Sequence, residues 1–145
     1  MKQAAAAEYA MMKAFYAFYI DRYVNLQHVP PAQRPLACLE ILEKMGKGMA
    51  TKGLRQAIND CVEESLRFDG KEVEKLDAEL RTRGIITLSE LRRRYSKGYA
   101  GIMKRGRIRN DTEYYLIRNV LDDPTEKSAE EKALLAKLAF EYEGV

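Results

Sequence analysis

The sequence predicts an all-α protein, a single compact bundle of six or seven helices. Glycine and proline are scarce, at nine and four among 145 residues, which is typical of a helical chain with few turns. Apolar residues recur at helical spacing, and no useful stretch alternates with the period of two that marks a strand. A chain of this length is expected to form one domain, 1–145, whose core needs no disulfide or metal.

The first helix is expected over about residues 3–27, ending before the paired prolines at 30 and 31. Its large apolar side chains cover an arc of about 240°, whereas a surface helix needs a stripe of only about 100°. We therefore expect this helix to be sandwiched between neighbouring helices or buried where two copies of the chain meet. The residues predicted to mediate self-association are Met11, Met12, Phe15, Tyr16, Phe18 and Tyr19.

A second helix is expected to open at Pro35, with Met45 on its inner face, and to stop at the glycines at 46 and 48. A third helix is expected from residue 51 or 53, and a short fourth ends at 84. The segment 46–53 contains Lys47 and Lys52 and could hold an anion, but a turn between two helices is the better-supported interpretation. Cys38 and Cys61 are expected to be small buried hydrophobic residues.

Thr87 and Glu90 match the pattern of a capping box, which predicts the clearest helix start in the chain. A fifth helix is expected from Leu88 to about Arg105, with Gly106 as its stop. A sixth is expected over about 111–122, and a seventh capped by residues 123, 124 and 126.

Positive charge is concentrated over residues 88–118, which carry nine basic and three acidic side chains, whereas residues 119–145 have a net charge of −4. On a continuous fifth helix most of these cations lie opposite the apolar face, and the following turn extends them. The candidate anion- or nucleic-acid-binding residues are Arg93, Arg94, Lys97, Lys104, Arg105, Arg107 and Arg109.

Two interpretations of this basic stripe stay open. It favours a protein that contacts nucleic-acid phosphates through Arg92–Arg109, or one that binds an acidic protein. Alternatively, the acidic C-terminal segment, through Glu130, Glu131, Asp122 or Asp123, pairs with the arginines inside the fold or across a dimer. A helix-turn-helix is disfavoured, because the helix that would enter the groove begins Asp111-Thr112-Glu113 and would meet phosphates with negative charge.

No catalytic residue, metal ligand or cofactor is predicted. His28 is the one histidine, and neither cysteine has a partner at metal-ligand spacing. Tyr9 and Lys13 match a Tyr-x-x-x-Lys dyad, but the dinucleotide fold that uses such a dyad is not predicted here. An enzyme would have to bring His28 beside a thiol or a carboxylate, so we expect a non-enzymatic chain.

The longest apolar run, 14–20, is too short for a signal core or a membrane span. We therefore expect a cytoplasmic protein with no membrane partner. The function expected from these observations is a non-catalytic helical interaction or regulatory protein that forms homo-oligomers through its first helix. Nucleic-acid binding through the basic stripe is the alternative.

Overall fold

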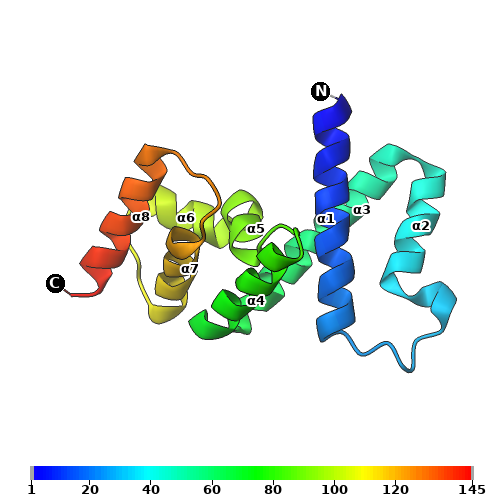
Figure 1. Ribbon diagram of the computed structural model, residues 1–145, viewed down its shortest axis with the longest axis horizontal. Helices are drawn as coiled ribbons and strands as arrows, with labels where there is room; N and C mark the ends of the chain where they lie inside the picture. The colour runs from blue at the N-terminus through cyan, green and yellow to red at the C-terminus, as the bar shows by residue number, and fades with distance from the viewer. Residues whose placement is uncertain (1, 145) are drawn as a thin grey trace. The chain divides into compact units, whose positions relative to one another are not determined.

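The computed structural model describes residues 2–144, which contain helices and no strand, so the all-α class is confirmed (Figure 1). The described residues form eight α-helices, one or two more than expected. The helices are α1 (Lys2–Tyr23), α2 (Pro35–Met45), α3 (Lys47–Glu64), α4 (Gly70–Thr82), α5 (Leu88–Tyr95), α6 (Lys97–Arg105), α7 (Asp111–Asp122) and α8 (Ala129–Tyr142), with 3₁₀ turns at Pro31–Gln33 and Ser65–Arg67.

The chain divides between Cys61 and Val62 into two compact units, each described by itself below. Unit 1 comprises α1, α2 and α3 as far as Cys61. Unit 2 comprises the remaining residues, with α4 to α8. A single domain over 1–145 stays a prediction.

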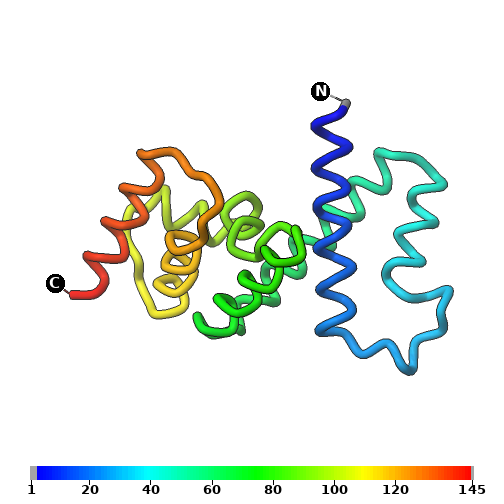
Figure 2. The backbone as a smooth tube through the Cα atoms, in the orientation of Figure 1, coloured from blue at the N-terminus to red at the C-terminus, as the bar shows by residue number. Residues whose placement is uncertain are grey.

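In unit 1, α1 ends at Tyr23, four residues before the predicted end, and the connection to α2 is the long loop that Figure 2 traces. Tyr9 and Lys13 of α1 donate hydrogen bonds to Glu43 near the end of α2, and the two helices run in opposite directions (Figure 1). Gly46 alone separates α2 from α3, with a φ of +151° that a residue with a side chain rarely adopts. The predicted turn over 46–53 is therefore wrong, because α3 already begins at Lys47.

The outer face of α2 is more apolar than expected. Cys38 is exposed rather than buried, whereas Cys61 is buried as predicted. Met45, expected on the inner face, is also exposed, together with Ile41. The reason is that a helix of eleven residues buries one narrow face, centred here on Leu39, and the described residues leave the opposite face uncovered.

In unit 2, α7 is the central helix and packs against α4, α5, α6 and α8. One hydrophobic cluster joins α6, α7 and α8. Its buried members are Tyr99, Ile102, Ile108, Leu116, Ile117, Val120, Leu135 and Leu138.

The predicted fifth helix is two helices. Ser96 takes an extended conformation, and its hydroxyl accepts a hydrogen bond from the Tyr99 amide at 3.1 Å, so that it caps α6. Serine is a good N-cap, and the glycines at 98 and 101 lower the helix propensity of the following turn. Both effects favour a break over a continuous helix. The end of α6 at Gly106, in the left-handed conformation, agrees with the prediction.

The last helix starts later than predicted. Ser128 caps α8 by accepting a hydrogen bond from the Glu131 amide at 3.1 Å. Asp123, predicted as part of the cap, instead has a buried side chain that accepts a hydrogen bond from Arg81 at 3.2 Å. The ion pair with the half-exposed Arg81 takes the buried Asp123 carboxylate away from the helix start.

Asp77 of α4 is a second buried carboxylate in unit 2. It accepts hydrogen bonds from the amide and the hydroxyl of Ser89, near the start of α5, and so joins the two helices. Burial raises the pKa of Asp77 from its usual 3.8 to about 6, against the opposing effect of the Ser89 hydrogen bonds. Because the folded chain holds this proton more tightly than the unfolded chain, stability is fully present below about pH 4 and is lost as pH rises through about 6.

The variant Asp77→Asn tests this account. An asparagine amide can accept from the Ser89 amide and donate to the Ser89 hydroxyl, but it has no charge to bury. Relative to wild type, its free energy of unfolding should rise by about 2 kcal/mol between about pH 4 and about pH 7, with an inflection near pH 6. Urea unfolding across this range measures the difference, with the exposed Asp60→Asn as the control. Parallel stability curves for wild type and Asp77→Asn would contradict the account.

Candidate functional site

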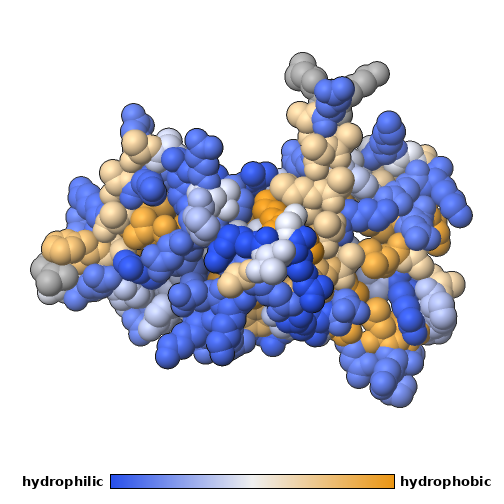
Figure 3. All heavy atoms as spheres, viewed as in Figure 1, coloured by the Kyte–Doolittle hydropathy of each residue, from blue (hydrophilic) through white to orange (hydrophobic). Residues whose placement is uncertain are grey.

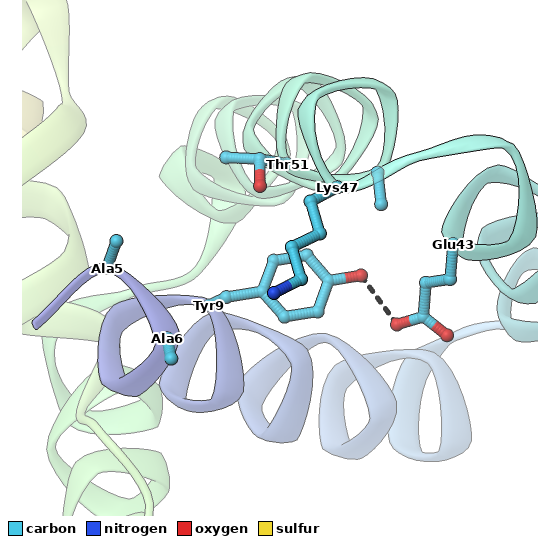
Figure 4. A pocket seen from close by; sticks show the side chains of 7 residues that line it. Ala5, Ala6, Tyr9, Glu43, Lys47 and Thr51 are labelled. Carbon is cyan, nitrogen blue, oxygen red and sulfur yellow. Dashed lines mark hydrogen bonds between the residues drawn. The ribbon is translucent and has the colours of Figure 1, made fainter. Parts of the chain in front are cut away.

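Unit 1 contains a cavity of about 570 Å³ between the start of α1, the end of α2 and the start of α3 (Figure 4). This volume lies in the range typical of small-molecule sites. The residues that line it are Ala5, Ala6, Tyr9, Glu43, Lys47, Ala50 and Thr51.

The walls and the polar end of the cavity come from different residues. Ala5, Ala6 and Ala50 supply apolar walls, and their methyl side chains are short enough to leave the space open. In Figure 4 the Lys47 side chain extends from α3 toward the Tyr9 ring, and the Tyr9 hydroxyl points at Glu43. The result is an apolar space with hydrogen-bonding and charged groups at one side.

Glu43 holds the polar end together. Its carboxylate accepts a hydrogen bond of 2.6 Å from the Tyr9 hydroxyl and two, of 2.8 and 3.1 Å, from the Lys13 ammonium. The hydrogen bond from Lys13, followed by that from Tyr9, lowers the pKa of the Glu43 carboxyl. Burial and the hydrogen bond to Glu43 raise the pKa of Tyr9 to about 12. At neutral pH Glu43 is therefore ionised and Tyr9 is neutral.

The charges around the cavity do not cancel. Lys13 forms an ion pair with Glu43 at 2.8 Å, which leaves Lys47 as the remaining charged group in the lining. Within residues 2–144, Lys47 has neither a hydrogen-bond partner nor an ion-pair partner. The cavity thus has a net positive charge at its polar end.

Most of the predicted basic stripe is ion-paired within unit 2. Arg93 donates two hydrogen bonds to Glu131 of α8, at 2.7 and 2.9 Å, and one to Glu90 at 3.1 Å. Arg94 donates to Glu90 at 2.7 Å. Of these contacts, only that between Arg93 and Glu131 agrees with the alternative in which the acidic C-terminal segment compensates the arginines, since Glu90 lies on α5 itself.

Two cations near the C-terminal end of the stripe, Arg105 and Arg109, share the carboxylate of a single glutamate. Glu113 of α7 accepts a hydrogen bond from Arg105 at 2.5 Å and lies 3.5 Å from Arg109. Three of the seven predicted cations have no ion pair among the described residues. They are Lys97, Lys104 and Arg107. The break at Ser96 also removes the continuous helix on which the stripe was predicted.

The apolar residues predicted on the first helix are mostly covered within one chain. Four of the six are buried, and two are partly exposed. The buried ones are Met12, Phe15, Phe18 and Tyr19, and the partly exposed ones are Met11 and Tyr16. The wide apolar arc is therefore already largely shielded from water before any second copy binds.

The remaining candidates for chemistry do not come together as a site. His28 is exposed in the loop after α1. The described residues contain no group of three or more histidine, cysteine or acidic side chains that could hold a metal ion. Over the same part of the chain, no helix has the length and apolarity needed to cross a membrane.

Sequence reasoning identified the cavity only in fragments. Tyr9 and Lys13 match a dyad, and Lys47 belongs to a possible anion-binding segment, but no pattern in the sequence predicts their proximity to Glu43. The alanine walls carry no chemical signal in a sequence. Only the antiparallel packing of α1 and α2 brings Tyr9 and Glu43, 34 positions apart, into contact.

Comparison with known proteins gave no match to a family model, a curated protein or a solved structure.

The titration of Tyr9 tests the polar end of the cavity. In Glu43→Gln the hydrogen bond can persist, but the negative charge that opposes phenolate formation is gone. The pKa of Tyr9 should then fall from about 12 toward its usual 10 without reaching it, because burial remains. Carbon-13 NMR of the tyrosine ring measures this, with Glu40→Gln on the exposed face of α2 as the control. An unchanged Tyr9 titration in Glu43→Gln would show that the two side chains do not interact in solution.

Proposed function

We propose that this chain is a non-catalytic interaction protein that self-associates through the outward face of α1. The observation that carries the proposal is the composition of this face. From Gln3 to Ala14, every exposed residue of the helix is uncharged, and all but one are alanines. An α-helix that faces water normally carries charged side chains there.

The charged residues of this part of α1 are turned to partners inside unit 1. Glu8 pairs with Arg55 at 3.3 Å, and Lys13 pairs with Glu43 at 2.8 Å. Figure 3 shows the resulting weakly hydrophobic surface along α1. The helix thus keeps a face from which charge has been withdrawn.

The spacing on this face is that of a helix–helix seam. Ala7, Ala10 and Ala14 are exposed at intervals of three and four residues, and the partly exposed Ala17 continues the series. Short side chains allow two helix backbones to approach closely. The series from Ala7 to Ala17 is about 15 Å long.

Such a seam buries little area for each residue, so the proposal is for a weak, concentration-dependent dimer. A further apolar surface of the same unit is available to a partner. It consists of the exposed side chains Ile41, Met45 and Met49 on α2 and α3.

The proposed surface differs from the residues predicted from sequence. The larger apolar residues of α1 serve mainly to pack the chain itself, and the alanine face is the part that stays open. Binding of nucleic-acid phosphates remains an untested alternative. It has less support than self-association, because only three of the seven predicted cations, Lys97, Lys104 and Arg107, have no ion pair within residues 2–144.

The test is to place charge in the seam. In the double variant Ala10→Glu, Ala14→Glu, two identical faces would bring like charges together. Glutamate has a helix propensity close to that of alanine, so the helix itself should be retained. Sedimentation equilibrium should show a wild-type mass that rises above 16.6 kDa with concentration, and a variant that stays at 16.6 kDa.

The matched control places the same substitutions at exposed alanines of unit 2, Ala78→Glu in α4 and Ala100→Glu in α6. This variant should associate like wild type. A wild-type chain that remains monomeric at every concentration, or a control that loses association equally, would refute the proposal.

A further inference from the structure

We infer that the cavity of unit 1 binds a small amphipathic anion, an apolar chain or ring that carries a carboxylate. Its lining shares no residue with the seam series Ala7, Ala10, Ala14 and Ala17, although Ala5 and Ala6 are also among the exposed alanines of α1. The inference rests on the shape of the cavity, on its apolar walls and on the uncompensated charge of Lys47.

The apolar part of such a ligand fits the walls. Three alanine methyl groups and the Tyr9 ring line a partly open space of about 570 Å³. Transfer of an apolar chain from water to these walls is favourable in proportion to the apolar surface that it buries. The cavity is open to solvent at one side, so a ligand can enter without unfolding a helix.

The polar part fits the charge balance. Glu43 is ionised but is satisfied by Lys13 and Tyr9, so it presents no free negative charge to a ligand. Tyr9 stays neutral at physiological pH because its pKa is raised. The group left to select the charge of a ligand is Lys47, with the Thr51 hydroxyl beside it in the lining as a further hydrogen-bond donor.

The preferred charge of the ligand follows from this arrangement. A cation would meet Lys47 as a like charge. A neutral chain would bury its apolar part but leave Lys47 without a counter-charge. An apolar chain that ends in a carboxylate buries its chain against the alanine walls and places its negative charge beside Lys47. Such an anionic chain should therefore bind best.

The experiment compares decanoate with decanol and decylammonium, using the full chain at a concentration where its measured mass is constant. Isothermal titration calorimetry should show decanoate binding about tenfold more tightly than decanol, a difference of about 1.4 kcal/mol, and no binding of decylammonium. The methyl NMR signals of Ala5, Ala6 and Ala50 should shift on addition of decanoate, while that of Ala78 in unit 2 should not.

Two pairs of variants separate the charge from the walls. Lys47→Met should abolish the preference for decanoate over decanol, whereas Lys52→Met, exposed on the same helix and outside the cavity lining, should retain it. Ala6→Leu fills the cavity and should weaken both ligands, whereas Ala4→Leu, exposed on α1 and outside the lining, should weaken neither.

The inference is overturned if decanoate does not bind saturably, or if decanol binds equally well to wild type. Equal effects of Lys47→Met and Lys52→Met would also overturn it, because they would indicate nonspecific attraction to surface charge. Circular dichroism of each variant checks that the helices are retained. Since these titrations do not depend on dimer formation, their outcome is independent of the self-association test.

Discussion

The buried carboxylate of Glu90 constrains the arrangement of charge in unit 2. Its side chain is only 2% exposed, and a buried charge is costly unless opposite charges and hydrogen bonds compensate it. Arg93 and Arg94 both donate to the same oxygen, Oε2, while the other oxygen has no hydrogen-bond partner in the described structure. Arg93 and Arg94 therefore supply the hydrogen bonds that compensate the Glu90 carboxylate. The same hydrogen bonds hold both guanidinium groups close to α5.

The same network connects helices that are distant in sequence. Arg93 continues from Glu90 to Glu131, which also accepts a hydrogen bond of 2.6 Å from the Tyr99 hydroxyl. Glu131 thereby links α5, α6 and α8. This link adds to the apolar cluster in which α7 packs against its neighbours. A sequence segment with a high positive charge thus uses much of that charge to hold its own fold. In unit 1, by contrast, Lys47 keeps its charge free beside an open cavity, and α1 keeps an uncharged face.

Local signals in the sequence were sufficient for much of the fold. The cap at Thr87 and the stop at Gly106 depend on residues within one helical turn, and the structure contains both. The break at Ser96 also has a local signal, a serine followed by glycines. The continuous apolar spacing on both sides of it nevertheless predicts one helix, and that prediction is wrong. The predicted burial of Cys38 is wrong because helical periodicity defines a face of a helix but does not show whether another helix covers that face.

The candidate sites were harder to predict for a physical reason. The charge state of a surface arginine depends little on its neighbours in sequence, but its availability depends on which carboxylate the fold brings beside it. Glu131 lies 38 positions from Arg93, and no pattern in the chain specifies that pairing over one with Asp123. The cavity of unit 1 likewise exists because three helices leave a space that their alanines do not fill.

The central claim is that the cations of α5 stabilise the fold and are not held ready for a ligand. A double-mutant cycle with Arg93→Met and Glu131→Gln tests it most directly, because glutamine can still accept the Tyr99 hydrogen bond while losing its charge. Urea unfolding at neutral pH should give a coupling energy of about 1 kcal/mol or more between the two positions. A coupling energy below about 0.3 kcal/mol would show that the pair contributes nothing to stability, and would leave Arg93 available to a partner.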